Sequence, residues 1–173
     1  MSALRTRLIA LGLSAALATI PLFESRGGKP DLVPYRDPIG ILTDCYGHTG
    51  DDVLAGKINS LQACEDKLDA DVLIAYNTVK RCTAGIPLTN GELNAYTSFA
   101  FNVGPGGKGR KDGFCALRSG SVPTFLKHLR AGNNIKACWS LLAWDKAGGV
   151  PLRGLTIRRG KEALLCLKDL PGP

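Results

Sequence analysis

Three side chains near the amino end of this sequence, Glu24, Asp37 and Thr43, could carry out acid–base chemistry on a sugar. Hydrolysis of a glycosidic bond needs one protonated acid at the leaving oxygen and a second carboxylate on the other face of the sugar ring. Glu24 follows an apolar run, where partial loss of water favours a protonated carboxyl group. Asp37 and Thr43 lie in a segment with strand character, so they could face Glu24 across a cleft.

The same residues also have ordinary structural interpretations, and their spacing alone does not decide between the two. Glu24 could be a carboxylate at the end of a buried segment, Asp37 a turn residue before Pro38, and Thr43 a strand residue. His48 stands alone in the segment Tyr46–Thr49. We expect it to be a structural, hydrogen-bonding histidine.

Neither a metal nor another cofactor is expected. The two histidines, His48 and His128, are far apart, and the sequence contains neither HExxH nor CxxC. Residues 104–109 match the spacing G-x-G-x-x-G. A dinucleotide fingerprint has to follow a strand and open a helix, whereas this one follows a predicted helix and continues as a loop.

Composition narrows the class of protein and the class of partner. The chain has 173 residues, a net charge of +7, 45% hydrophobic and 21% charged residues, which is typical of a globular chain. The positive charge predicts an anionic partner, either nucleic acid, a membrane surface or a cell-wall polymer. Only 6% of the residues are aromatic and no nucleic-acid-binding motif is present, so nucleic acid is not expected. The six cysteines predict three disulfides formed in an oxidising compartment.

The amino-terminal segment predicts export. Arg5 and Arg7 precede an uncharged run from Leu8 to Phe23, which would span roughly 24 Å as a helix, against about 30 Å for a bilayer core. Residues 1–23 are therefore a cleavable signal peptide, with Ala16-Leu17-Ala18 before the cut, or an uncleaved signal anchor. A buried first helix of a cytosolic domain is the remaining alternative. Pro21 is expected to kink or end a helix there.

The rest of the chain, residues 24–173, predicts an α+β fold. A short strand is expected at Leu32-Val33, and a short hairpin or small sheet within residues 40–50. The pattern then becomes helical, from about residue 60 to 80 and over 89–102, where Thr89 and Glu92 match a capping box. Further helices are expected at 114–120, 122–131, 133–145 and 155–168. Strands and helices do not alternate, which excludes an α/β class.

Several separated motifs resemble the phage lysozymes, which are endolysins of glycoside hydrolase family 24. The core motif comprises Tyr35-Arg36-Asp37-Pro38, Gly40-Ile41-Leu42-Thr43 and residues 45–50, CYGHTG. Further similarity follows in the same order, at 81–82, 87–89, 99–104, 144–149, 152–155 and 158–162. The resemblance covers roughly residues 24–168.

The resemblance implies a small β-containing lobe, a larger α-helical lobe and an active-site cleft between them. It also implies hydrolysis of the β-1,4 bond between N-acetylmuramic acid and N-acetylglucosamine in peptidoglycan, with inversion. Glu24 would be the acid that protonates the leaving oxygen. Asp37 would orient or activate the attacking water, or stabilise positive charge on the sugar, and Thr43 would hold that water. The family has eight residues between the Glu and the Asp; this chain has twelve, which we interpret as a longer loop within residues 25–32.

The other expectations also follow from the resemblance. Asn102 would contact a sugar, and Arg153, Arg158 and Arg159 would lie at the cleft edge. Of the fifteen ways to pair six cysteines, the family pattern favours Cys82–Cys115, and we hypothesise Cys45–Cys64 and Cys138–Cys166. The enzyme would be a monomer, exported to the periplasm and first tethered to the inner membrane through its amino-terminal segment. A lytic transglycosylase and a non-catalytic cell-wall-binding module are the alternatives.

Overall fold

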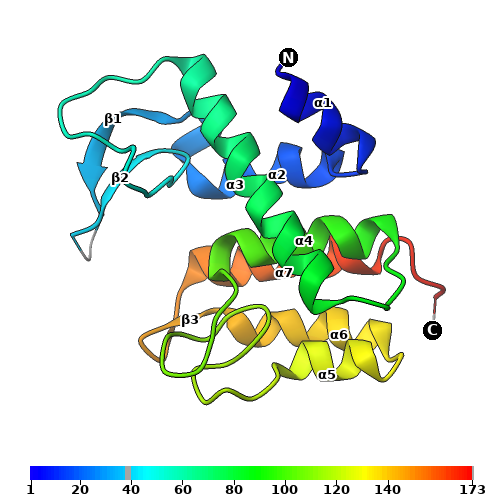
Figure 1. Ribbon diagram of the computed structural model, residues 1–173. Helices are drawn as coiled ribbons and strands as arrows, with labels where there is room; N and C mark the ends of the chain where they lie inside the picture. Colours follow the sequence, from blue (N-terminus) through cyan, green and yellow to red (C-terminus); the bar gives the residue numbers. More distant parts are fainter. Residues whose placement is uncertain (38–39, 173) are drawn as a thin grey trace. The chain divides into compact units, whose positions relative to one another are not determined.

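The computed structural model describes residues 1–37 and 40–172, which form two compact units (Figure 1). The first unit is Met1–Leu73 and the second is Ile74–Pro173. The boundary falls inside helix α3 (Leu61–Cys82), which begins in the first unit and ends in the second. All three proposed catalytic side chains belong to the first unit.

The first unit opens with two helices, α1 (Ala3–Ala10) and α2 (Ser14–Glu24). The chain breaks between them at Gly12, whose φ of +85° lies in the region that glycine adopts most readily. Pro21 does not end the helix, because α2 continues past it to Glu24. Near the end of a helix the missing proline N–H removes only one intrahelical bond. The buried apolar side chains are Leu8, Leu13, Ala16, Leu17 and Ile20.

None of the described helices is by itself long and apolar enough to cross a membrane. Taken together, α1 and α2 have a suitable length and composition, but they are bent against each other by 117°.

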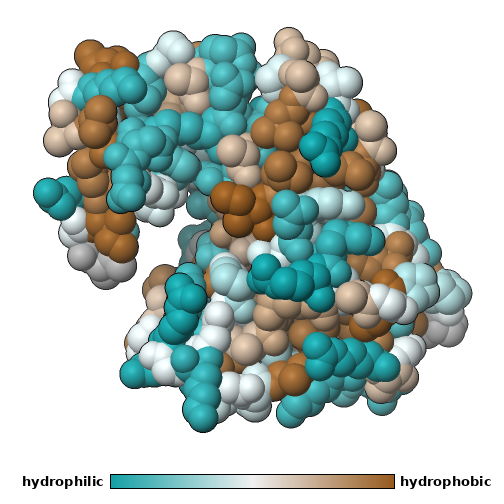
Figure 2. Space-filling model, in the orientation of Figure 1, coloured by the Kyte–Doolittle hydropathy of each residue, from teal (hydrophilic) through white to brown (hydrophobic). Residues whose placement is uncertain are grey.

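An antiparallel hairpin follows, made of β1 (Asp31–Arg36) and β2 (Leu42–Cys45). The strand predicted at Leu32-Val33 therefore exists and is longer than expected. β2 lies within residues 40–50 but pairs with this earlier strand, and Asp44 and His48 form an isolated antiparallel bridge in the same range. The hairpin or small sheet expected there is therefore present in part. Exposed apolar side chains run along the hairpin (Figure 2); the larger ones are Val33, Tyr35 and Ile41.

Helix α3 forms as its sequence predicts. The Ser60 hydroxyl accepts a hydrogen bond from the Ala63 amide at 3.1 Å, which caps the amino end. The residues at helical spacing are buried, as expected for one apolar face. They are Cys64, Leu68, Val72, Ala75 and Val79.

The second unit is mainly helical. Helix α4 (Asn90–Val103) carries the predicted capping box, which is confirmed in both directions between Thr89 and Glu92. α4 packs on α7 (Arg153–Leu167), and α5 (Thr124–Arg130) packs on α6 (Asn134–Trp139). The core is aromatic, with Tyr96, Phe99, Phe114 and Phe125 in mutual contact.

Two details of the second unit differ from the sequence prediction. Residues 114–120 are not a helix but turns, with the Gly120 amide bonded to the Leu117 carbonyl at 2.8 Å. Ser119, Gly120 and Ser121 favour such turns over helix. The helix expected over 133–145 is divided into α6 and a 3-10 segment, η2 (Ser140–Trp144), which precedes the short strands β3 (Lys146–Ala147) and β4 (Val150–Pro151).

Three disulfides join Cys45 to Cys64, Cys82 to Cys115 and Cys138 to Cys166. They are the three pairs expected from the sequence. The first ties β2 to α3, and the third ties α6 to α7.

Candidate active site

Glu24 is the last residue of α2 and is partly buried. It lines an open pocket of about 690 Å³ together with residues of β1. A β-carbon added to Gly47 would lie 3.5 Å from Oε2 of Glu24, so the carboxyl group faces the turn that follows β2. The segment after Glu24 contains a short 3-10 turn, η1 (Arg26–Gly28), where the longer loop was expected.

Asp37 and Thr43 are held through the same backbone group. The Ile41 carbonyl accepts hydrogen bonds from the Asp37 amide at 2.9 Å and from the Thr43 hydroxyl at 3.1 Å. The Asp37 carboxylate in turn accepts one from the Ile41 amide at 2.8 Å. This ring fixes Asp37 at the hairpin turn; Pro38 and Ile39, which follow it, lie outside the described residues.

Tyr35 links the three candidates. It lies directly opposite Thr43 in the hairpin register, and side chains directly opposite in an antiparallel pair share a face. Burial raises the pKa of the Tyr35 hydroxyl, and the negative charges of Asp31, Asp37 and Glu24 raise it further. Glu24 and Tyr35 thus line the same pocket, and Tyr35 pairs with Thr43 across the hairpin. The core motif includes Tyr35, but sequence reasoning gave it no role, because the expected strand ended at Val33.

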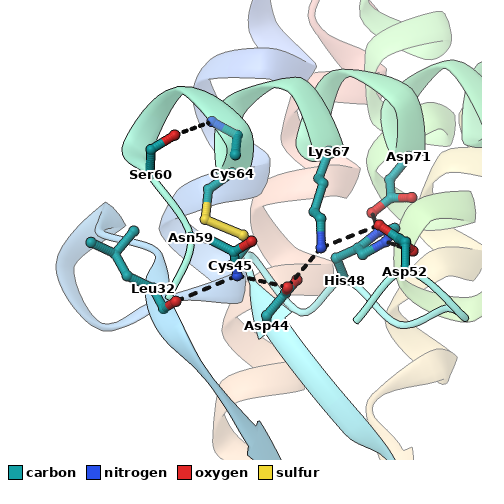
Figure 3. The surroundings of a disulfide bond; sticks show 11 residues. Leu32, Asp44, Cys45, His48, Asp52, Asn59, Ser60, Cys64, Lys67 and Asp71 are labelled. Atoms are coloured by element: carbon teal, nitrogen blue, oxygen red, sulfur yellow. Dashed lines mark hydrogen bonds and ion pairs between the residues drawn. A yellow bond between two sulfur atoms is a disulfide. The ribbon is translucent and has the colours of Figure 1, made fainter. Parts of the chain in front are cut away.

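A polar cluster holds β2 against α3 (Figure 3). Its central residue is Asp44, whose side chain is almost completely buried. Oδ2 of Asp44 accepts hydrogen bonds from Lys67 Nζ at 2.7 Å and Asn59 Nδ2 at 2.8 Å. Lys67 also lies 3.2 Å from Oδ2 of Asp52. We call these four residues the Asp44 cluster; sequence spacing did not predict it.

His48 makes two carboxylate contacts, consistent with the structural role expected for it. Nδ1 lies 2.8 Å from Asp71 Oδ2, and Nε2 lies 3.0 Å from Asp52 Oδ1. Burial alone would lower the pKa of His48, but the hydrogen bonds to Asp52 and Asp71 outweigh it and the pKa is raised. The hydrogen bond from His48 is the largest cause that lowers the pKa of Asp52 to about 2. His48 therefore joins the turn after β2 to α3.

These contacts predict a pH-dependent stability. A histidine whose pKa is higher in the folded state stabilises the fold fully below the unfolded value of 6.5, and the gain is lost as pH rises through the folded pKa. We expect the free energy of unfolding of the native chain to exceed that of His48→Asn near pH 6, and the difference to shrink toward pH 9. Urea denaturation across this range measures it. A constant difference would contradict the charged pair, and His128→Asn serves as the control.

The second unit contains a groove of about 1000 Å³ that includes Asn102. Oδ1 of Asn102 accepts a hydrogen bond from Nη2 of Arg159, which fixes the orientation of the amide. Arg159 is fixed in turn, since its Nε donates to the Trp144 carbonyl at 3.0 Å and its guanidinium lies 4.7 Å from the centre of the Phe99 ring. The side-chain amide of Asn102 thus lies at the groove in an orientation that Arg159 fixes.

The arginines expected at the cleft edge are placed differently from one another. Arg158 does not lie at an exposed edge as expected, because it is only 3% exposed. Its Nε pairs with Glu162 at 3.0 Å, and its Nη2 donates to the Ser98 carbonyl at 3.1 Å. Its guanidinium is enclosed in the second unit and is not offered to a ligand. Arg159 is equally buried but lines the groove, and Arg153 is exposed at the start of α7.

Within residues 1–37 and 40–172, no three or more His, Cys, Asp or Glu side chains come together in a way that could hold a metal ion.

Comparison with known proteins identifies the family. A family model described as phage lysozyme matches residues 27–162. It covers Asp37 and Thr43 but begins three residues after Glu24. The SAR-endolysin of bacteriophage PS119 is 33% identical over 162 residues, covering 90% of this chain and 88% of that protein. The SAR-endolysin of Enterobacteria phage P21 is 30% identical, covering 91% and 88%.

Solved structures show the same relationship. The active form of the P1 phage endolysin Lyz matches with a TM-score of 0.77 at 28% identity, covering 98% of this chain and 94% of that one. The secreted inactive form of the same endolysin matches less well, with a TM-score of 0.52 at 29% identity over 71% and 78% of the two chains. The expected lysozyme-like fold is confirmed, and the chain belongs to the phage lysozyme family.

Proposed function

We propose that this lysis enzyme, a glycosidase by its family, hydrolyses the β-1,4 bond between N-acetylmuramic acid and N-acetylglucosamine in peptidoglycan. The proposal is supported by three positions: Glu24 and Tyr35 line one open pocket, Thr43 lies opposite Tyr35 in the hairpin, and Asp37 lies in the turn between the two strands. Glu24 is at the end of α2, beside an open pocket, where a carboxylic acid can protonate the oxygen of a departing sugar.

Asp37 and Thr43 each accept one hydrogen of the attacking water and so orient it. The Thr43 hydroxyl donates its hydrogen to the Ile41 carbonyl, so its oxygen accepts a hydrogen from the water. Asp37 accepts the other hydrogen as general base, which directs a lone pair of the water at the anomeric carbon. The water attacks as the bond to the leaving oxygen breaks, and configuration inverts; such a pair of carboxyl groups stands about 6.5–9.5 Å apart.

Product analysis tests the reaction. Purified peptidoglycan is digested in water enriched in ¹⁸O, and the muropeptides are analysed by mass spectrometry. A muramidase yields reducing N-acetylmuramic acid ends that carry the label. A lytic transglycosylase would yield anhydro ends without it, and a binding module would sediment with the wall and release nothing.

For the second unit we propose that Asn102 contacts a sugar of the bound glycan, because its amide is oriented by Arg159 at the groove wall. Arg153, exposed at the start of α7, stays a candidate for a contact at the edge of that groove. The enzyme acts on the wall as a monomer.

We further propose that residues 1–23 are a signal anchor that is retained after release. As a continuous helix the uncharged run 8–23 would be roughly 24 Å long, and the flanking residues with Arg5, Arg7 and Glu24 would extend it over 3–24 to about 33 Å, comparable to the thickness of a bilayer core. In the fold the segment is bent by 117° and buries five apolar side chains. Cleavage after Ala18 would remove Ser2 and Arg5, the residues that bind the buried carboxylate of Asp69.

Retention gives a physical route to latency. While the run spans the membrane, Glu24 is fixed at the interface and the first unit lacks its first two helices. Since the run contains no cysteine, control rests on topology and refolding rather than on thiol exchange. Mass spectrometry of the soluble periplasmic protein should find the residues before Ala18 intact, and the membrane-bound fraction should lack muramidase activity. A shortened soluble protein, or an active bound fraction, would contradict the proposal.

A further inference from the structure

We infer that Lys67 is a positioning residue for the reaction: through its ion pair with Asp44 it fixes the strand that carries Thr43. The inference rests on the muramidase function proposed above, and it gives the Asp44 cluster a role in catalysis without contact to substrate.

Thr43 and Asp44 are consecutive residues of β2, so their side chains leave opposite faces of the strand. Asp44 points to α3, where Lys67 binds Oδ2 of its carboxylate, and Asn59, in the segment before α3, binds the same oxygen (Figure 3). Both residues are buried, with 4% of Thr43 and 1% of Asp44 exposed. Any shift of Asp44 along or about the strand axis therefore moves the Thr43 hydroxyl as well.

The strand is joined to α3 at two neighbouring points. Cys45 is bonded to Cys64, and Asp44 is paired with Lys67 one turn further along the helix. A single attachment leaves a strand able to pivot around it, whereas a second attachment stops the pivot. The backbone of Asp44 adds a further restraint, because its amide and carbonyl both bond to His48, at 3.0 and 2.9 Å.

The backbone at this point needs such restraint. Cys45 has a φ of +54°, and it is the one residue other than glycine in the described part of the chain with a positive φ. Side-chain-bearing residues rarely adopt this conformation, and it persists only where the surrounding structure holds it. The ties from α3 supply that support directly beside Thr43.

Stability alone is a weak explanation for the ion pair. Removing two charges from water offsets most of their attraction, so a buried pair is often no better than apolar side chains of similar volume. A structural pair elsewhere in the same unit provides a matched comparison. Arg5 of α1 pairs with Asp69 of α3, whose carboxylate is as buried as that of Asp44. This pair does not touch the hairpin residues of the site.

The test compares Lys67→Met with Arg5→Met, both in the full-length soluble protein. We expect Lys67→Met to lower kcat between about 10-fold and 100-fold, since a displacement of about 1 Å of a reacting group can cost that much. KM should stay within about twofold, because no substrate contact is lost. Lys67→Arg, which retains the charge, should recover part of kcat. Arg5→Met should lower Tm and leave kcat unchanged.

A double-mutant cycle with Thr43→Ala links the effect to the threonine. If Lys67 acts through Thr43, Lys67→Met adds little further loss of kcat in the Thr43→Ala protein. Full kcat in Lys67→Met, an equal loss in Arg5→Met, or additive losses in the cycle would each overturn the inference. The native protein must first release reducing muramic acid ends; its failure to do so would contradict the proposed function rather than the role of Lys67.

Discussion

Replacing Glu24 by glutamine is expected to reduce kcat by about 10²–10⁴-fold while the protein stays folded, which is the range typical for the loss of a general acid. Glutamine has the shape of the acid but cannot give a proton to the leaving sugar oxygen. The carboxyl group lies at the end of α2 beside an open pocket, so the change disturbs little packing. Release of reducing ends from purified peptidoglycan measures kcat, and thermal unfolding checks the fold.

Glu65 provides the matched control, because it is the other glutamate of the first unit and is also half-buried. Glu65→Gln should leave kcat within about twofold of the native value, since a surface change away from the reacting atoms has little effect. Unchanged cleavage by Glu24→Gln would remove Glu24 from the mechanism. This outcome matters because the family match begins just after Glu24, so its assignment depends on geometry.

The largest effect on stability is expected in the second unit, from Glu162→Gln. The carboxylate of Glu162 is 2% exposed and binds three groups: Arg158 at 3.0 Å, Arg159, and the Ser98 hydroxyl at 2.7 Å. Glutamine removes the negative charge and leaves two buried guanidinium groups uncompensated. Breaking a buried ion pair in this way costs about 3–5 kcal/mol. Urea denaturation followed by circular dichroism measures the loss.

Leu164→Gln is the control, because Leu164 lies on the exposed face of the same helix and is 65% exposed. It should change the free energy of unfolding by no more than about 0.5 kcal/mol. If Glu162→Gln were equally mild, the two arginines would have to find compensation elsewhere. Because Arg159 also orients Asn102, we expect KM for peptidoglycan fragments to rise in Glu162→Gln but not in Leu164→Gln.

Secondary structure was predicted correctly from the sequence where a local pattern of residues determines it. Helix α3 follows from apolar residues at helical spacing, and α4 from the capping box of Thr89 and Glu92, both of which depend only on near neighbours. Residues 114–120 were expected to be a helix, but the hydrogen bonds of Leu117 with Gly120 and Ser121 close a turn there. Ser119, Gly120 and Ser121 favour a turn over a helix, and their preference determines the local structure.

In the site, too, the sequence predicted neighbouring residues better than partners that are distant along the chain. The resemblance implies roles for Asp37 and Thr43, which lie close together in the hairpin, Asp37 in the turn and Thr43 on β2. The partners that hold them come from far along the chain: Lys67 lies 23 residues after Asp44, and no periodicity predicts which acid it meets. The resemblance placed Arg158 at the cleft edge, although Glu162 four residues later on the same helix was a signal of an internal pair.

The contact between Ser2 and Asp69 has a practical consequence for anyone who purifies this protein. The Ser2 hydroxyl caps α1 through the Arg5 amide and also donates to the buried Asp69 carboxylate at 2.9 Å. An affinity tag or fusion partner attached at the amino end therefore adjoins a packed part of the molecule. The carboxyl end, where Pro171 and Gly172 follow α7 as exposed residues, is the better place to attach one.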